Sequence, residues 1–185
     1  LLFKITGQEG FLEVAKGIKE RIRKDFWNGT TLADGLGDFT IRPNIFIAYY
    51  AYPDLLADEE WKKCFDAAIA ALWLDWGGFS SIDKSNPLFC HWHTGENNRS
   101  YHRGDSWYWI NNLAAICMHR LDKTRYAYHI DRILRASTSE ILWMGAIGSH
   151  SEISSADRQE SRGCLSQAWS LGIYIELVKE LYKNA

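Results

Sequence analysis

Glu152 lies in a polar stretch of small residues, GSHSEISSADRQESRGCLSQAWS, which runs from position 148 to position 170. Hydroxyl and cationic residues flank it: Ser149, Ser151, Ser154, Ser155, Arg158 and Arg162. Hydrogen bonds from hydroxyl groups and the field of nearby cations both favour the ionised form of a carboxyl group. An ionised carboxylate in a sugar-binding pocket can take a proton from water, which is general-base chemistry. A lone glutamate in a loop is more often simply solvated, so this interpretation needs support from other residues.

The chain is unusually aromatic, with nine Trp, nine Tyr and eight Phe among its 185 residues. Several of them have polar neighbours: Trp92 lies between two histidines, Tyr101 beside His102, and Trp107 near Asp105. A sugar ring has two C–H faces and a hydroxyl rim, so flat aromatic faces with hydrogen-bonding neighbours suit it. Because large aromatics also fill cores and line pockets of every kind, a structural role is an equal alternative for each of them.

Other kinds of catalytic site lack the residues that they need. Cys90, His91 and His93 lie together near His102, but a closed zinc site takes four ligands from paired motifs, and a second pair is missing. We therefore expect no metal and no cofactor. The sequence has no GxSxG elbow, no histidine close to Cys164, and no glycine-rich phosphate loop.

Composition limits the partners. Lys and Arg number 21 against 23 Asp and Glu, a formal charge of −2 with both signs interspersed, so we expect no binding to nucleic acid. Apolar runs are interrupted by charge well short of the roughly 20 residues that span a bilayer, so we expect no membrane segment. The four cysteines are far apart, which favours free thiols in a reducing compartment and predicts a cytoplasmic protein.

Hydrophobic spacing predicts helices along most of the chain. Apolar residues recur every three or four positions over 11–26, 61–72, 109–120, 126–134 and 165–182, and the run 45–56 is apolar nearly all round. Pro53 should limit or kink that run. Side-chain caps are expected at Asp58, at Asp105 or Ser106, at Thr124, and at Ser139, where a shorter helix would run to Met144. The fold class is therefore all-α, with six or seven helices in a single domain over residues 1–185 and no convincing strand pair.

Helical periodicity fails from Gly77 to Ser106. A stretch this long without regular structure is usually functional or disordered, and this one holds too many aromatics to be disordered. In a series of helical hairpins the loops gather at one end. We therefore expect this loop, the segment from Arg42 to Asn44, and the Glu152 loop to lie together.

Three segments resemble a known family, in the family's order. They read DFTIRPNIFIAYYAYPDLL, SYHRGDSWYWINNLAA and GAIGSHSEISSADRQESRGCLSQAWSLG. Their counterparts in the C-terminal amylo-α-1,6-glucosidase domain of glycogen debranching enzymes run RPNQ, then YHxGxxW, then SEI or PEL followed by GCxxQAWS. Each motif alone is weak, but three in register are fairly specific, and the resemblance covers about Phe11 to Leu181.

The resemblance implies an (α/α)6 toroid, twelve helices in an inner and an outer ring with substrate at the mouth. The family hydrolyses, with inversion, the α-1,6-linked glucose at a branch point of glycogen or a limit dextrin, using a carboxylic acid and a carboxylate base. The glutamate of the SEI motif is the family's base and matches Glu152. The same match implies that further residues line the glucose subsite: Arg42, Asn44, Tyr101, His102, Asp105, Trp107, Gln167 and Trp169. For Arg42, Asn44 and Trp169, structural support is nearly as good an expectation.

The chain also departs from the family. Ile45 stands where RPNQ has its Gln, and Asp105-Ser106 replaces a usual TV pair. The family's acid is an aspartate in an upstream W-G-R-D type motif, which this chain lacks, and six helices make only half a toroid. Half a ring would expose a large apolar face. We therefore expect either a subunit joined by a second polypeptide that carries the N-terminal half and the acid, or an excised C-terminal fragment; Asp105 could replace the acid only if burial raised its pKa.

Two alternatives stay open. The same ring could belong to a glucoamylase-like or trehalase-like α-glucosidase, which products from branched dextrin, maltose and trehalose would separate. The chain could instead be a non-catalytic carbohydrate-binding or assembly subunit, whose role would survive replacement of Glu152 by Gln.

Overall fold

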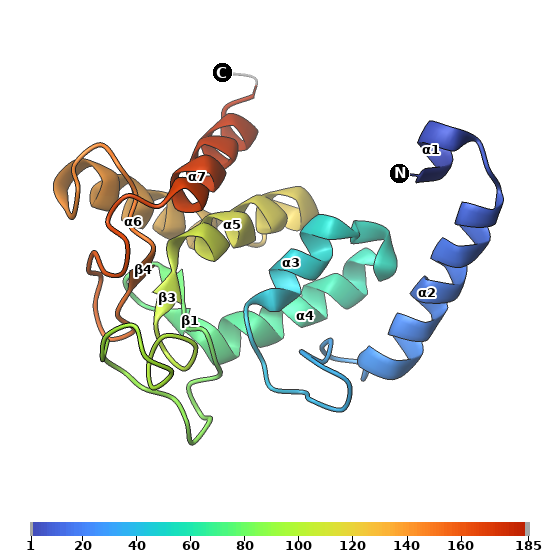
Figure 1. Ribbon diagram of the computed structural model, residues 1–185, viewed down its shortest axis with the longest axis horizontal. Coiled ribbons are helices and arrows are strands. Elements are labelled where there is room, and N and C mark those ends of the chain that lie inside the picture. The colour runs from blue at the N-terminus through green and yellow to red at the C-terminus, as the bar shows by residue number, and fades with distance from the viewer. Residues whose placement is uncertain (1, 184–185) are drawn as a thin grey trace.

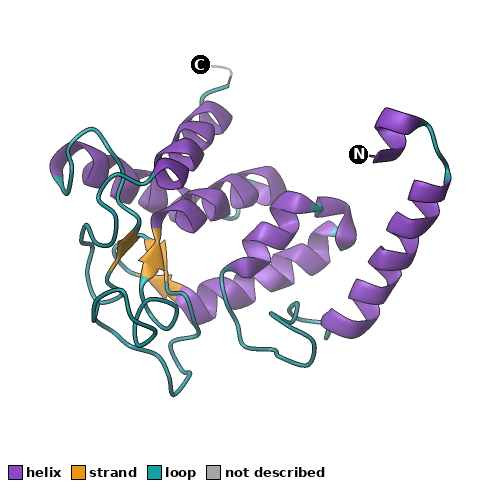
Figure 2. Cartoon of the chain, in the orientation of Figure 1, coloured by secondary structure: helices purple, strands orange, loops and turns teal. Residues whose placement is uncertain are grey.

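The computed structural model describes residues 2–183 and confirms the all-α class, with seven α-helices in that range (Figures 1 and 2). The helices are α1 (Leu2–Thr6), α2 (Gly10–Phe26), α3 (Asn44–Ala51), α4 (Asp58–Leu72), α5 (Tyr108–Asp122), α6 (Ala127–Trp143) and α7 (Ala168–Leu181). A short 3-10 helix, Pro53–Leu55, follows α3, where Pro53 was expected to limit the run. Four two-residue strands were not expected: β1 (Trp73–Leu74), β2 (Gly78–Phe79), β3 (Ser106–Trp107) and β4 (Ile153–Ser154). They form two antiparallel pairs, β1 with β2 and β3 with β4.

The helices after α2 pack in two layers. Helix α3 contacts α5, and α5 contacts α7, so every second helix of this part of the chain lies in one row. Helix α4 packs on α3 and α5 from the other side, and α6 packs on α5. The loops that follow α4 and α6 lie together, on the left of Figure 1.

The starts of α4 and α5 differ from the caps expected. Ala57, not Asp58, is the N-cap of α4, and its N–H donates to the Glu60 carboxylate at 2.8 Å. Helix α5 begins after Trp107 instead of at Asp105 or Ser106, because residues 106 and 107 are extended in β3. The shift leaves both polar side chains free for buried contacts elsewhere.

The expected break inside α6 is absent from the described structure. Helix α6 begins at Ala127, after Thr124, and runs unbroken through Ser139 to Trp143. Its buried positions continue at helical spacing to Glu140 and Ile141, so the second half of the helix has an inward face of its own.

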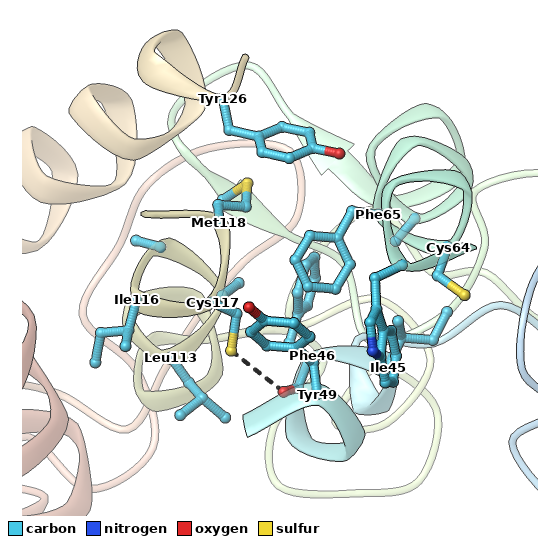
Figure 3. Close-up of a cluster of buried hydrophobic side chains, with 14 of the residues drawn as sticks. Ile45, Phe46, Tyr49, Cys64, Phe65, Leu113, Ile116, Cys117, Met118 and Tyr126 are labelled. Atoms are coloured by element: carbon cyan, nitrogen blue, oxygen red, sulfur yellow. Dashed lines mark hydrogen bonds between the residues drawn. The ribbon is translucent and has the colours of Figure 1, made fainter. Parts of the chain in front are cut away.

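The core fills the space between α3, α4 and α5 (Figure 3). The ring centroids of Phe46 and Phe65 lie 4.8 Å apart, and Tyr49 meets Phe65 edge-on at 5.3 Å. The Cys117 thiol donates to the carbonyl oxygen of Phe46 at 3.3 Å (Figure 3). Aromatic pairs contribute about 0.5–1.5 kcal/mol each beyond the area that they bury, so this cluster holds α5 firmly at the base of the loops.

Helix α2 stands apart from the other helices, as Figure 1 shows. None of its residues is buried, and Leu12, Val14 and Ile18 are exposed. It is attached by Ile22 and Phe26, which pack against the core, and by Arg23, which bonds both oxygens of the Glu60 carboxylate at 2.8 Å. The helix therefore presents an apolar face that the rest of the described chain does not cover.

None of the helices within residues 2–183 is long and apolar enough to cross a bilayer. All four cysteines are free thiols, of which Cys164 alone is exposed.

Candidate functional site

Three loops meet at the end of the helices, which confirms that the segments expected to gather there do so. Arg42 joins the first two, because its Nη1 donates to the carbonyl oxygens of Ser81 at 2.9 Å and His102 at 2.8 Å. The Asp157 N–H donates to the His91 carbonyl at 2.8 Å, which joins the second loop to the third. The pairing of β3 with β4 adds a second connection, because Trp107 pairs with Ile153 and the Tyr108 N–H donates to the Glu152 carbonyl at 3.2 Å.

Glu152 is held at both carboxylate oxygens. The Tyr101 hydroxyl donates to Oε1 at 2.8 Å, and the backbone N–H of Cys164 donates to Oε2 at 3.1 Å. The side chain is largely enclosed, with 7% of the residue's surface exposed. Burial and the bond to Glu152 raise the pKa of Tyr101 far above its usual value, so its hydroxyl stays protonated and donates. Each oxygen of the Glu152 carboxylate therefore has one hydrogen-bond donor.

Gly163 explains the Gly-Cys turn that follows Glu152. Its φ is +65°, in the left-handed region that glycine adopts without strain. A Cβ at this position would lie 2.5 Å from Oε2 of Glu152. Only glycine therefore lets the chain pass close enough for the Cys164 N–H to reach the carboxylate.

The hydroxyl and arginine residues around Glu152 have other partners. The expectation from the sequence that they would bond the Glu152 carboxylate was therefore wrong. Ser151 bonds the Glu140 carboxylate, and Ser155 bonds Asp157. Arg158 and Arg162 both bond the Glu160 carboxylate. Ser149 and Ser154 bond Ser166 and the Arg158 carbonyl. The donors to Glu152 are instead a phenol and a backbone amide.

An aromatic wall stands next to Glu152. The His102 and Trp107 rings stack at an angle of 8°, with centroids 5.3 Å apart. Trp169, from the first turn of α7, meets Trp107 edge-on at 6.2 Å. The Tyr101 ring lies against Trp107 at 4.7 Å, so the residue that bonds Glu152 also contacts this wall.

The wall borders a hollow of about 270 Å³. It is lined by Arg42, Pro43, Asn44, Ser81, His102, Trp107, Trp109, Ile110 and Trp169. Pockets for drug-sized ligands run to about 300–1,000 Å³, so this one suits a ligand of one or two sugar rings. Five of the residues expected at a glucose subsite therefore line one cavity: Arg42, Asn44, His102, Trp107 and Trp169.

Arg42 and Asn44 also support the site. Asn44 donates to Oδ1 of Asp34 at 2.7 Å, and Arg42 lies 3.4 Å from Oδ2 of the same carboxylate. One guanidinium nitrogen of Arg42 donates to the loop carbonyls of Ser81 and His102. Both alternatives left open for these residues, support and direct contact, are thus compatible with their position.

Asp105 lies beneath the site instead of lining it, contrary to the subsite expectation. It is fully buried, and its Oδ2 accepts bonds from His93 at 2.8 Å and Ser100 at 3.0 Å. Burial raises its pKa despite these bonds. A raised pKa is what a general acid needs, but an enclosed side chain does not reach a glycosidic oxygen in this conformation.

Trp169 lines the hollow, whereas Gln167 is not among its lining residues. Gln167 is the N-cap of α7, and its N–H donates to the His150 carbonyl at 2.8 Å. Trp169 is 49% exposed, with its ring at the hollow. The Gln167 side chain is half-buried and makes no hydrogen bond within the described residues.

Some site residues were not predicted. Ser81 and Trp109 line the hollow, and the Cys164 amide binds Glu152. Trp109 belongs to the helical run that begins α5, so its spacing indicated only a core residue. A backbone donor such as the Cys164 N–H cannot be recognised from residue types, because nearly every residue has one.

Within residues 2–183, no group of three or more His, Cys, Asp and Glu side chains is arranged to hold a metal ion. Compared with known families, the chain matches the profile described as amylo-alpha-1,6-glucosidase over residues 3–176. None of the curated proteins searched matches it.

Proposed function

Because this chain belongs to the amylo-alpha-1,6-glucosidase family, we propose that it takes part in the inverting hydrolysis of α-1,6-linked glucose at glucan branch points. The substrate would be a branched α-glucan such as glycogen or a limit dextrin. The proposed setting is the cytoplasm, where free thiols persist.

The main support for the proposal is the position of Glu152. Inverting glycosidases need a carboxylate base that activates water and an acid that protonates the leaving oxygen, with roughly 6.5–9.5 Å between the two carboxyl groups. Glu152 is held in place by hydrogen bonds from Tyr101 and the Cys164 N–H, next to the aromatic residues that border the hollow. In the proposed mechanism the glucose ring stacks on the wall formed by His102, Trp107 and Trp169, and Glu152 takes a proton from the attacking water.

The general acid comes, in this proposal, from a polypeptide segment outside the chain. Asp105 is enclosed and therefore a poor candidate. The uncovered apolar face of α2, with Leu12, Val14 and Ile18, supports a partner that packs there. A second polypeptide carrying the other half of a helical ring would cover this face and bring the acid to the opposite side of the sugar.

The test uses the native assembly, purified from its source with whatever accompanies the chain. We expect glucose release from a limit dextrin by the assembly, and a fall of at least about 10² to 10⁴-fold for Glu152→Gln with the assembly intact. Glu160→Gln is the matched control, since Glu160 bonds only the exposed Arg158 and Arg162 and the variant should keep its activity.

Each alternative predicts a different result. A non-catalytic assembly subunit would keep full activity with Glu152→Gln, which would refute the proposed base. Faster release from maltose or trehalose than from branched dextrin would favour a glucoamylase-like or trehalase-like activity instead.

A further inference from the structure

Glu140 on α6 is a fully buried carboxylate that binds one loop through three of its residues. Its Oε1 accepts bonds from the hydroxyls of Ser151 at 2.6 Å and Ser161 at 2.7 Å. Its Oε2 accepts bonds from His150 Nδ1 at 2.6 Å and the Ser151 N–H at 3.2 Å. Four donors saturate a carboxylate, and all of them come from the loop that carries Glu152.

These contacts fall on the two segments that build the Glu152 site. Ser151 immediately precedes Glu152, and Ser161 lies three residues before Cys164, whose N–H binds the Glu152 carboxylate. The segments are also paired directly, because the Glu152 N–H donates to the Cys164 carbonyl at 2.8 Å. Glu140 thus fixes the carboxylate of Glu152 and one of its two donors relative to each other.

The network continues into the helices through His150. Its Nε2 lies 3.2 Å from Asn112 Nδ2, and the Asn112 carbonyl accepts a bond from Ser137 at 2.8 Å. An amide nitrogen can only donate, so His150 Nε2 accepts and Nδ1 carries the proton that it donates to Glu140. Burial opposes the ionised form of Glu140, but the bonds from His150, Ser151 and Ser161 outweigh it and lower its pKa. The loop is therefore anchored to α5 and α6 by an ionised, fully bonded group.

We propose that Glu140 is a positioning residue for Glu152, holding the two segments of residues 150–164 so that the base keeps its bonds to Tyr101 and the Cys164 N–H. The proposal rests on the proposed function of Glu152 as the general base. Glu140 is not among the residues lining the hollow, so it acts on the chemical step and not on sugar binding. A base displaced by about 1 Å costs roughly 10²-fold in rate, which sets the size of the effect.

The first experiment compares Glu140→Gln with the unmodified chain in the native assembly. We expect kcat for glucose release to fall about 10- to 100-fold while KM stays within about twofold. Hydrogen exchange should quicken in residues 150–164 and stay unchanged in α5. Glu160→Gln, which alters a carboxylate of the same loop, should move neither quantity.

Two results would overturn the proposal. One is a rise of KM in parallel with the loss of rate, which would mean that the whole site has been disturbed. The other is unchanged exchange in residues 150–164, or faster exchange throughout the chain, either of which would make Glu140 an ordinary buried group.

A milder variant tests the same proposal if Glu140→Gln fails to fold. Ser161→Ala removes one of the four donors and leaves the charge of Glu140 in place, so it should give the same pattern with a smaller fall in kcat. Unaltered kcat and loop exchange in this variant would contradict the proposal. The two ideas fail separately: activity that survives Glu152→Gln refutes the base, whereas loop exchange tests the anchoring role of Glu140 whatever the reaction.

Discussion

The Tyr101 hydroxyl donates a 2.8 Å hydrogen bond to Oε1 of Glu152 across 51 positions of sequence. Tyr101 belongs to the long loop between β2 and β3, and Glu152 precedes β4. The carboxylate is therefore oriented only when both loops are folded against each other. The second donor, the Cys164 N–H, depends on a glycine turn in the same way.

Tyr101→Phe should slow the reaction and leave the fold intact. The ring keeps its contacts with Trp107 and His102, but Glu152 loses one of its two donors. We expect a fall of about 10- to 100-fold in the rate of glucose release by the native assembly, because a hydrogen bond to a charged group is worth about 1.5–3 kcal/mol. Tyr174→Phe is the control, since its hydroxyl bonds Thr138 on another part of the molecule. Equal rates for the two variants would show that Tyr101 does not assist Glu152.

Gly163→Ala should destabilise the chain by about 1–3 kcal/mol in urea unfolding. The variant puts a Cβ 2.5 Å from Oε2 of Glu152 at a residue whose φ is +65°. Gly172→Ala provides the matched control, because Gly172 is inside α7 and a Cβ there meets nothing within 4 Å. That variant should gain up to about 1 kcal/mol from helix propensity. An unchanged free energy of unfolding for Gly163→Ala would mean that the turn can relax around the new Cβ and that glycine is not required for the contact between the Cys164 N–H and Glu152.

Helix positions could be predicted because each helix buries a stripe of its own. The apolar residues of α4 and α6 recur at helical spacing, and the spacing marks them before any contact is known. The ends were less predictable. Asp58, Asp105 and Ser106 are all suitable cap residues, yet tertiary contacts decided where the helices begin, and β3 extended the chain through Ser106.

Site residues that belong to a family motif could be predicted, whereas contacts that depend on the folded geometry could not. The family motifs placed Arg42, His102, Trp107 and Trp169, and all four line one hollow. The surroundings of Glu152 were misjudged, because nearness in sequence was taken to mean nearness in space. Ser151, the residue before Glu152, bonds Glu140 instead, a helix residue whose spacing indicates only an inward position. Strands of two residues, such as β4, are too short to show an alternating pattern.

Trp169→Ala should weaken sugar binding with little loss of stability. Its ring lines the hollow and is 49% exposed, so the folded chain gains little from it. Stacking contacts are worth about 0.5–1.5 kcal/mol, which predicts a Kd for isomaltose raised by about 2- to 10-fold in titration calorimetry of the native assembly. Trp143→Ala removes another exposed tryptophan, at the end of α6, and should leave Kd unchanged. An unchanged Kd for Trp169→Ala would assign this residue to structural support.

Acid should weaken the attachment of α2 through Glu60. The hydrogen bonds from Arg23 lower the pKa of the Glu60 carboxyl from 4.5 to about 2, and the Ala57 N–H adds to the effect. A carboxyl whose pKa is lower in the folded chain stabilises it fully above the unfolded value, and this contribution is lost as the pH falls. The window therefore runs from about pH 4.5 down to about pH 2.

Glu60→Gln measures this contribution directly. At pH 7 the variant should unfold with a free energy lower by about 1 kcal/mol, a modest figure because the Arg23–Glu60 pair is partly exposed and screened by solvent. The difference from the unmodified chain should shrink below pH 4.5 and vanish only below about pH 2, where both chains carry a neutral group at this position. Glu59→Gln, which removes a far more exposed carboxylate one residue away, should show a smaller difference at pH 7. A Glu60→Gln difference that stayed constant from pH 7 to pH 2 would show that the charge of Glu60 does not hold α2 in place.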